Sequence, residues 1–420
     1  MLKIGIVGVG TVGRSVIDIL ETNKEIITAR AGEELVVVKG VVRNIAKRRD
    51  VNIPLSDNYR DVTRDPDIDI VVELMGGIED AREVVEDALR HGKRVATANK
   101  AMLAYYRYEL EALSGDIPLA FEASVAGGIP IIKAIREGLS ANHIESIRGI
   151  INGTCNYILT KMVTKGDTLE TVLKEAQELG YAEADPTFDV GGYDAAHKIL
   201  ILGSIAYGID AKPEEILIEG ITGITLEDVE FAKNNGYTIK HLGIARRIGL
   251  EVSLRVHPVM IPKDQMIAKV DGVMNGISVV GDRVGETMFY GPGAGGDATA
   301  SAVIADLVQI ARDDRSPMLG FKTPLEQGGL SLAAKEDIIT KYYIRLQVED
   351  KLGVLEKVAS VFAQSNISIQ TVQQKSKGHN EAFLLITTHE AREPNIVTAL
   401  SAIESLPFVS DRPTMIRIED

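Results

Sequence analysis

Residues 2–13 read LKIGIVGVGTVG, and this stretch decides the fold of the first part of the chain. The apolar run Leu2–Val7 predicts a buried strand, and the apolar periodicity after Gly13 predicts a helix. Between them, Gly8, Gly10 and Gly13 allow a tight turn and let a pyrophosphate approach the helix N-terminus closely. In this strand–turn–helix context the pattern predicts a dinucleotide-binding fold, the alternative being a purely structural glycine turn.

Strands and helices alternate through the first 135 residues. Strands are expected at 35–42, 69–74, 94–97 and 119–121, and an amphipathic helix at 79–91. This alternation is typical of a parallel sheet with helices on both faces, whose ligands bind at the carboxyl ends of the strands. The turn at Gly8–Gly13 and the segments 73–77, 97–100 and 122–128 should therefore meet at one crevice. Lys100 would then reach the nicotinamide ribose or the substrate, unless it is a surface lysine.

The residue after the second strand bears on the choice of nicotinamide cofactor. An acidic residue at that position accepts a hydrogen bond from the ribose 2′-hydroxyl and favours NAD. Here the position is Arg43, and Lys47, Arg48 and Arg49 follow it. Four cations can meet a 2′-phosphate, so we expect NADP as the cofactor, with NAD as the other candidate. A solvated basic helix face is the alternative interpretation of the cluster.

The pattern changes from residue 143 onward. A strand is expected at 143–151, helices at about 154–164 and 168–179, and strands within 238–261 and 273–290, with Asn275-Gly276 and Gly281-Asp282 as turn signals. Gly291–Gly296 is a second glycine-rich loop that opens a helix and could bring the chain back to the cofactor, or serve only as a structural loop. We expect residues 136–295 to form an α+β domain for substrate binding and dimerisation, and the helix at about 296–312 to join the first domain, 1–135.

The densest group of ionisable residues lies between Gly180 and Lys198. Asp185-Pro186 and Gly191-Gly192 are loop signals, and an apolar helix follows Asp194. Asp194 and Lys198 are four residues apart, so they face the same side of that helix. A lysine on a buried helix is unfavourable unless it is paired or functional. These residues alone leave two interpretations open, an acidic loop with an ordinary helix-face ion pair or an active site.

The last part of the chain has a regular pattern of its own. Residues 313–341 contain Pro317, Pro324 and Gly328-Gly329 and are expected to form a linker. From 342 to 420 the expected order is strand 342–349, helix 353–364, strand 367–375, strand 381–389, helix 393–405 and strand 408–419. This β-α-β-β-α-β order is typical of a ferredoxin-like domain.

The amino-acid composition argues against several kinds of partner and cellular location for this chain. Lys and Arg number 46 and Asp and Glu 60, so the net charge of −14 argues against nucleic acid and anionic membranes as partners. Cys155 is the one cysteine, which excludes an intrachain disulfide and suits a reducing cytoplasm. No apolar run reaches the ~18 residues of a membrane span, and no export leader is evident. We therefore expect a cytoplasmic protein.

The spacing from Ala176 to Lys198 resembles the defining motif of homoserine dehydrogenases. Ala176, Gly180, Asp185-Pro186, Asp189, Gly192, Asp194 and Lys198 all fit it, and the segments 72–77, 97–101, 121–131, 149–154 and 156–159 agree. The resemblance covers about residues 1–315. Cys155 departs from it, because many relatives carry a hydroxyl residue there. The unit at 342–420 resembles an ACT domain, with 350–355 as its strand-to-helix turn.

The resemblance implies the reversible NAD(P)-dependent interconversion of L-homoserine and L-aspartate 4-semialdehyde, a step of threonine, methionine and isoleucine biosynthesis. It implies that Lys198 transfers the proton, with Lys100 as a second active-site lysine beside the nicotinamide. Two lysines close together should each depress the pKa of the other. It further implies that Glu183 and Asp194 hold the substrate and Asp189 supports the site. The cofactor contacts it implies are Gly10, Thr11, Val12, Lys100 and Gly295, to which the glycine-rich turn adds Gly8 and Gly13 and the end of the second strand adds Arg43.

The same resemblance implies a cation and an effector. A structural monovalent cation, such as sodium, would be held by the carbonyl oxygens of Val125, Gly127 and Ile129 beside the Glu122 carboxylate. ACT units pair edge to edge and bind amino acids near the turn that carries Gly353. We therefore expect a homodimer or homotetramer with threonine as feedback effector, a purely dimerising module being the alternative.

Two other functions compete with this interpretation. One is a semialdehyde dehydrogenase of glyceraldehyde-phosphate type with Cys155 as nucleophile, which requires a histidine to activate the thiol. No motif links His143, His197, His241 or His257 to Cys155, so the cysteine is expected to pack in a core and His197 to be structural. The other is a non-catalytic protein that senses an amino acid through its ACT unit, which would have no use for the residues between Glu183 and Lys198.

Overall fold

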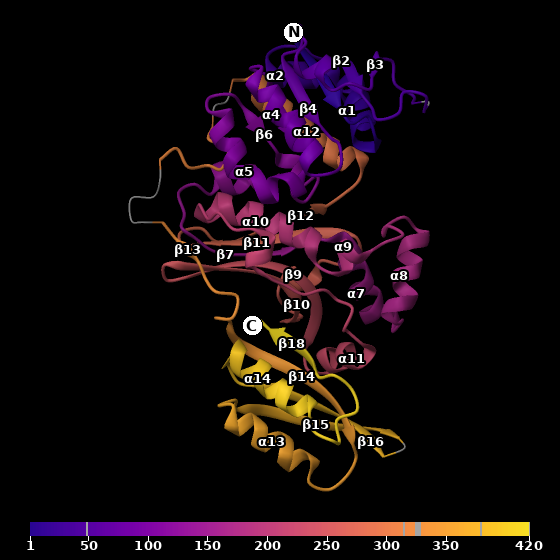
Figure 1. The fold of residues 1–420 in the computed structure, drawn as a ribbon, viewed down its shortest axis with the longest axis vertical. Coiled ribbons are helices and arrows are strands. Elements are labelled where there is room, and N and C mark those ends of the chain that lie inside the picture. The colour runs from indigo at the N-terminus through magenta and orange to yellow at the C-terminus, as the bar shows by residue number, and fades with distance from the viewer. Residues whose placement is uncertain (48, 314–315, 324–328, 379, 420) are drawn as a thin grey trace.

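The computed structural model describes residues 1–420 except 48, 314–315, 324–328, 379 and 420. Figure 1 shows three units stacked along the long axis, with the N-terminal unit at one end, a mixed unit in the middle and the C-terminal unit at the other end. Within the described residues, no helix is both long and apolar enough to cross a membrane.

The N-terminal unit is the predicted parallel sheet with helices on both faces. Its strands are β1 (Leu2–Val7), β2 (Leu35–Val41), β3 (Leu55–Ser56), β4 (Ile70–Glu73), β5 (Arg94–Thr97) and β6 (Leu119–Ala120), in the order β3-β2-β1-β4-β5-β6. Its helices are α1 (Thr11–Thr22), α2 (Lys24–Ala31), α3 (Arg60–Thr63), α4 (Glu79–Arg90) and α5 (Lys100–Ser114). The parallel register along β1, β2, β4, β5 and β6 confirms the Rossmann-type fold.

A late helix completes this unit. Helix α12 (Gly296–Ala311) packs beside α1, and its Ala300, Val303 and Leu307 are buried in the same apolar cluster as Val16 and Leu20 of α1. The chain thus returns to the dinucleotide-binding sheet after crossing the middle unit, as the second glycine-rich loop predicted.

The middle unit is an antiparallel sheet with α10 (Tyr193–Tyr207) on the side that faces the N-terminal unit and α11 (Leu226–Asn234) next to the C-terminal unit (Figure 1). Its strands β7 (Ile144–Ile150), β9 (Tyr237–Ile248), β10 (Glu251–Pro262), β11 (Met274–Gly281) and β12 (Gly285–Pro292) follow the order β12-β11-β7-β9-β10. Its other helices are α7 (Gly153–Lys165), α8 (Leu169–Glu178) and α9 (Thr187–Val190). Helix α10 is buried along most of its length between α5 and strands β9 and β10.

Local sequence signals explain several helix boundaries. The Thr168 hydroxyl accepts a hydrogen bond from the Thr171 amide and caps α8. The two-residue signal Asn275-Gly276 was wrong as a turn, because both residues pair within β11 with β12, and Gly276 also pairs with β7. Glycine is needed at 276 for packing, since a Cβ there would lie 2.5 Å from a Val270 methyl carbon. Gly281-Asp282 does stand at a turn, between β11 and β12.

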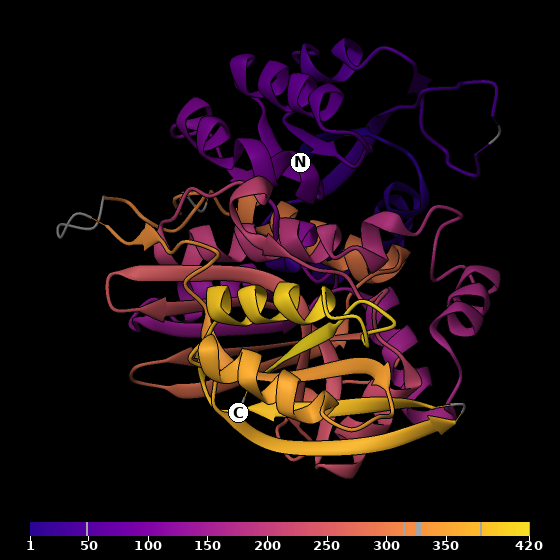
Figure 2. The ribbon, with the colours of Figure 1, turned by 60° about the horizontal axis from the view of Figure 1, so that its bottom comes forward.

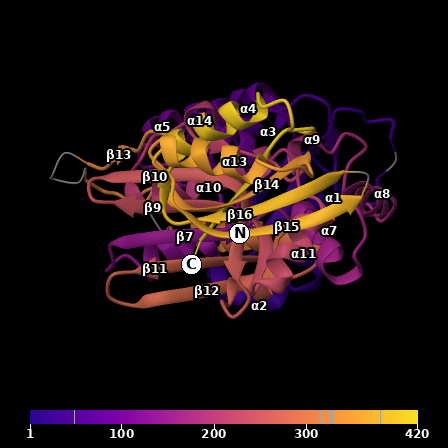
Figure 3. The same ribbon diagram turned by 90° about the horizontal axis from the view of Figure 1, so that it is seen from below.

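The C-terminal unit has the predicted ferredoxin-like order. It consists of β14 (Ile339–Glu349), α13 (Val354–Gln364), β15 (Ile369–Gly378), β16 (Glu381–Thr388), α14 (Glu393–Glu404) and β18 (Thr414–Ile418), with the strand order β18-β14-β16-β15. Figure 3 shows α13 and α14 on one side of these strands. The short strand β17 (Ala391–Arg392) is an addition that the pattern did not predict.

The middle and C-terminal units share one sheet, which the sequence did not indicate. Strand β18 pairs in parallel with β10 through Val259 and Met260, so the strands continue from one unit into the next (Figure 2). Arg417 of β18 is fully buried and bridges Glu219 of the middle unit and Glu393 of α14. Part of the expected linker, 314–315 and 324–328, lies outside the described residues, and its later part forms β13 (Ser331–Leu332) along β10.

Candidate functional site

The expected crevice is a cavity of about 670 Å³ between the N-terminal and middle units. The N-terminal unit lines it with residues that follow the carboxyl ends of its parallel strands, namely Val12, Leu74, Met75, Ala98, Lys100, Ala123, Ala126 and Gly127. The middle unit adds Asn152, Thr154, Glu183, Asp189, Asp194 and Lys198. The second glycine-rich loop adds Gly293 and Gly295. Strand ends far apart in sequence therefore converge at one place, as expected of a doubly wound sheet.

The first glycine-rich turn has a separate physical reason for each glycine. Gly8 has a φ of +107°, and a Cβ there would lie 2.5 Å from the Leu74 carbonyl group. A Cβ on Gly13 would lie 2.4 Å from the Gly8 oxygen. Gly10 precedes the first residue of α1, Thr11, and faces open space. The turn thus leaves room for a phosphate at a helix N-terminus, which fits a dinucleotide.

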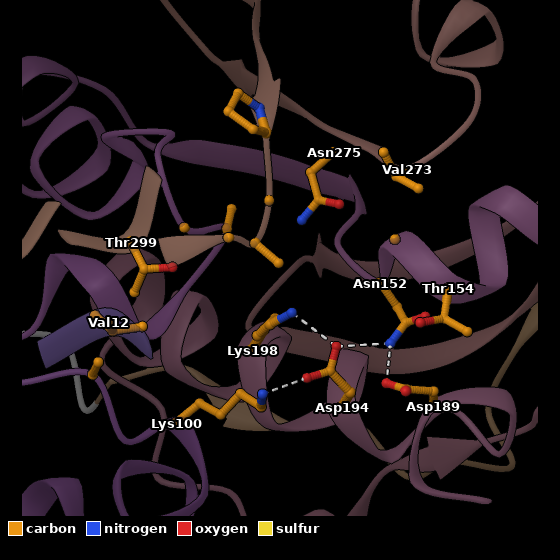
Figure 4. Close-up of a pocket in the computed structure, with 18 of the residues that line it drawn as sticks. Val12, Lys100, Asn152, Thr154, Asp189, Asp194, Lys198, Val273, Asn275 and Thr299 are labelled. Carbon is orange, nitrogen blue, oxygen red and sulfur yellow. Dashed lines mark hydrogen bonds and ion pairs between the residues drawn. The ribbon is translucent and has the colours of Figure 1, made fainter. Parts of the chain in front are cut away.

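The Asp194 carboxylate lies at the centre of the site, where it pairs with two lysines (Figure 4). Its Oδ2 lies 2.8 Å from Nζ of Lys198, one turn along α10, and its Oδ1 lies 2.8 Å from Nζ of Lys100, the first residue of α5. Lys198 also donates to the Ile151 carbonyl at 2.7 Å. Asp194 is only 4% exposed and Lys198 only 8%, so this ion pair is largely shielded from water.

The backbone explains how these groups are held. Asn99 caps α5 by accepting from the Met102 amide at 3.0 Å, which places Lys100 at the start of the helix. Gly192, with a φ of +90°, precedes α10, so Asp194 lies in the first turn, where a negative charge is favourable. A Cβ on Gly192 would lie 3.1 Å from the Glu219 oxygen, so the helix start packs closely against the middle unit.

The shared carboxylate shifts the two lysine pKa values in opposite directions. Burial lowers the pKa of Lys198, and the nearby Lys100 ammonium lowers it further, which outweighs the attraction of Asp194. Burial also lowers the pKa of Lys100, but its pairing with Asp194 wins and leaves that pKa raised. The expected lowering by the neighbouring lysine is therefore found at Lys198, whereas at Lys100 the pairing with Asp194 decides the net shift. Burial alone would raise the Asp194 pKa, yet the two ammonium groups hold it well below its ordinary value.

A residue without a role in the sequence interpretation, Asn152, joins the carboxylates. Its side-chain amide donates to Asp189 Oδ1 at 2.8 Å and to Asp194 Oδ2 at 2.9 Å, while its oxygen caps α7 by accepting from Cys155 at 2.8 Å. Burial raises the pKa of Asp189, partly offset by this hydrogen bond. The signal for Asn152 was its position just after a strand and before a helix, where asparagine is a favoured cap.

The remaining substrate candidate, Glu183, lies on the exposed loop between α8 and α9 and lines the cavity. Asn275 also lines it, is 1% exposed, and fills the space that a Cβ on Gly293 would need. The sequence pattern predicts Asn275 as a turn residue and therefore does not indicate that it lines the cavity.

The predicted cofactor contacts fall into two places. Val12, Lys100 and Gly295 line the cavity, and Gly295 precedes α12 with a φ of +119°. Arg43 and Lys47 are exposed beyond β2, and the Arg49 guanidinium donates to the carbonyls of Asn44 and Lys47. Arg48, the fourth cation of that cluster, lies outside the described residues.

The segment predicted to hold a cation is buried. The Glu122 carboxylate accepts from the amides of Ile132 at 2.9 Å and Lys133 at 3.0 Å, and burial raises its pKa. Ile129 uses its carbonyl to accept from Ile131. In the described part of the chain, no donor is bonded to the carbonyl oxygens of Val125 and Gly127, and no three His, Cys, Asp or Glu side chains are grouped as metal ligands. Oxygens of this kind suit a hard monovalent cation.

Cys155 lacks the surroundings of a nucleophile. It is fully buried on α7, its thiol donates to the Asp189 carbonyl at 3.2 Å, and burial raises its pKa well above the ordinary value. His197 packs edge-on against Tyr105 and Phe188, and burial lowers its pKa to about 4. The cysteine therefore belongs to the core, as expected, and the thiol-based alternative has no activated group here.

Comparison with known proteins gives a consistent result along the chain. Models described as "Homoserine dehydrogenase, NAD binding domain", "Homoserine dehydrogenase" and "ACT domain" match residues 8–115, 130–308 and 342–408. The chain is 52% identical to the homoserine dehydrogenase of Helicobacter pylori, with 100% of this chain and 99% of the relative covered.

Solved structures agree with the sequence comparison. The crystal structure of a homoserine dehydrogenase from Thiobacillus denitrificans is 47% identical with a TM-score of 0.94, and covers 100% of this chain and 98% of its own. A hyperthermophilic archaeal homoserine dehydrogenase in complex with NADPH is 28% identical with a TM-score of 0.63, and covers 74% of this chain and 97% of its own.

Proposed function

The chain belongs to the homoserine dehydrogenase family, and we propose that the cavity around Asp194 is its active site, with Lys198 as the proton-transfer residue. The enzyme is an oxidoreductase that interconverts L-homoserine and L-aspartate 4-semialdehyde with a nicotinamide cofactor. The observation that carries the assignment of Lys198 is its buried pairing with Asp194 beside the cavity. We place the enzyme in the cytoplasm, where the free thiol of Cys155 stays reduced.

The two lysines divide the chemical work because their environments differ. Oxidation of the substrate alcohol requires a base for the hydroxyl proton, and the bound nicotinamide supplies the hydride acceptor. The lowered pKa of Lys198 favours its neutral amine, so its Nζ takes that proton and returns it in the reverse direction. The raised pKa of Lys100 keeps it charged, so it holds Asp194 and polarises the substrate oxygen.

The acidic residues orient the substrate. The Glu183 carboxylate is exposed at the cavity wall and can pair with the substrate α-ammonium without a large desolvation penalty. Asp194 fixes the lysines and the substrate hydroxyl, and Asp189 is tied to Asp194 through Asn152. Oxidation thus moves one proton to Lys198 and one hydride to the cofactor.

Lys198→Ala should lower kcat by about 10³-fold, because general acid–base groups contribute roughly 10²–10⁴-fold to catalysis. The KM for the cofactor should change little, since the cofactor contacts lie on other elements. Steady-state kinetics in both directions measure this, with Lys161→Ala on α7, outside the cavity wall, as the matched control. Near-normal turnover by Lys198→Ala would refute the assignment.

We further propose NADP as the preferred cofactor, with Arg43 at the 2′-phosphate. Arg43 follows the end of β2 and is exposed, and no carboxylate takes its position. The NADPH in the archaeal relative's structure supports this choice.

Arg43→Ala should raise the KM for NADP⁺ by about 10-fold, as expected for one lost charge-assisted contact. The KM for NAD⁺, which lacks the phosphate, should stay nearly constant. Arg60→Ala, which removes an exposed arginine of the same unit, is the control. Equal effects on both cofactors would contradict the role of Arg43.

We propose that the carbonyl oxygens of Val125, Gly127 and Ile129 hold a monovalent cation beside Glu122, and that the ion is structural. Saturating such a site stabilises the fold by roughly 3 kcal/mol at about a hundred-fold excess over Kd. Thermal unfolding in sodium chloride should therefore occur at a higher Tm than in choline chloride of equal ionic strength. An identical Tm in the two salts would remove the cation from the proposal.

The C-terminal unit is proposed to bind threonine and to pair with a second copy. Asp350–Glu356 and Gln374 line a hollow of about 520 Å³ at the β14–α13 turn. Strand β15, at the end of the sheet, exposes nearly all its residues, so its free edge can pair with another chain. A homodimer or homotetramer would follow from such pairing.

Millimolar threonine should lower the activity, whereas serine, the control, should have a smaller effect. Gly353, with a φ of +86°, begins α13 at this hollow, so Gly353→Ala should strain the turn and weaken the threonine effect while leaving basal activity unchanged. Activity assays and sedimentation with and without threonine measure both properties. If threonine changes neither the activity nor the mass of the oligomer, the C-terminal unit is a purely structural module.

A further inference from the structure

A second buried carboxyl group lies beneath the active site and takes no part in the chemistry proposed above. Glu73 is the last residue of β4 and is completely buried. Its Oε1 accepts from the Met75 amide at 2.8 Å, and its Oε2 accepts from the Thr97 hydroxyl at 2.5 Å. A buried carboxylate is unfavourable without a cationic partner, so its presence calls for an explanation.

The partners of Glu73 belong to two neighbouring strand ends. Thr97 ends β5, and its hydroxyl also accepts from the Asn99 amide at 3.0 Å. The Asn99 side chain donates back to the carbonyls of Met75 and Gly77, at 3.3 and 2.8 Å. The segments 74–77 and 97–99 are therefore tied together twice, through Glu73 and through Asn99.

This network is linked to both sides of the active site. Asn99 caps α5, whose first residue is Lys100, the partner of Asp194. Met75, which is part of the network, and its neighbours Leu74 and Ala98 line the cavity. The Gly8 turn also packs on the Leu74 backbone, since a Cβ on Gly8 would lie 2.5 Å from it.

We propose that Glu73 is a positioning residue of the reaction: it joins the ends of β4 and β5 so that Lys100 reaches Asp194 and the cavity wall keeps its shape. The inference rests on the proposed role of Lys100. A carboxylate suits this task because it accepts from two donors at once, whereas a glutamine side chain offers one oxygen and one donor group.

The ionisation of Glu73 predicts how kcat/KM should depend on pH. Burial raises its pKa to about 7, although the hydrogen bonds from Thr97, Met75 and Asn99 oppose the shift. These partners are uncharged, and the ionisable groups that line the adjoining cavity are Lys100, Glu183, Asp189, Asp194 and Lys198. As the pH falls below about 7, Glu73 becomes protonated, and one of its two acceptor oxygens becomes a donor. The hydrogen bonds that join the ends of β4 and β5 are then weakened, so kcat/KM should decrease as the pH is lowered through about 7.

Glu73→Gln is the central variant. We expect it to fold with an unchanged far-UV spectrum, to lose about 10-fold in kcat/KM for homoserine because of misplaced groups, and to lose the ionisation near pH 7 from its profile. Asp87→Asn is the matched control, since Asp87 is a buried carboxylate of the same unit that pairs with Arg64 away from the cavity. Unchanged kcat/KM and an unchanged pH profile in Glu73→Gln, or an equal loss in Asp87→Asn, would overturn the proposal.

Two further variants separate this proposal from the proposed function. Thr97→Val removes the donor to Glu73 without touching a charge, and it should reproduce the loss in kcat/KM. In a Lys100→Ala background the effect of Glu73→Gln should shrink, because the two residues act through one contact. Additive losses would overturn the role of Glu73 and leave that of Lys100 intact, whereas full activity of Lys100→Ala would overturn both.

Discussion

A single carboxylate, that of Asp194, pairs with two lysines from different units, and the geometry of the candidate active site depends on this pairing. Lys198 comes from the same helix, whereas Lys100 begins a helix of the dinucleotide-binding unit. A buried carboxylate is tolerated only when its charge is matched by well-placed partners. The two units must therefore meet at the distance that the ion pair sets, and the apolar contact of α5 with α10 fixes the same distance independently.

The same pair shows how one acid can prepare two amines for different tasks. Lys198 is surrounded by protein, so the loss of hydration dominates and its pKa falls. Lys100 lies at the rim of the cavity and keeps some contact with solvent, so its attraction to Asp194 dominates and its pKa rises. Position within one cavity, rather than residue type, separates the group proposed to move a proton from the group proposed to keep its charge.

Local patterns predicted the helices and strands of this chain well, but predicted poorly the contacts between side chains that are distant in sequence. The run Leu2–Gly13 and the alternation that follows it were sufficient for the parallel sheet and its crevice, because both follow from short-range periodicity. The prediction of a turn at Asn275-Gly276 was wrong, because the sequence cannot distinguish a glycine that is required for packing from one that is required for a turn. Asn152 and Glu73 act through contacts with residues distant in sequence, and no single-sequence pattern encodes such contacts. The resemblance to the family motif was the source of the roles proposed for Asp194 and Lys198, which spacing alone left open.

The shared sheet of the middle and C-terminal units also bears on how the chain folds. The pairing of β10 with β18 joins segments that are far apart in sequence, so closing this contact carries a large entropic cost before any stabilisation is gained. The hairpin of β9 and β10 needs only its own short turn and can form early. Arg417 can pair with Glu393 inside the C-terminal unit, but it meets Glu219 of the middle unit only when β18 docks on β10, and at that step the two units become a single cooperative structure.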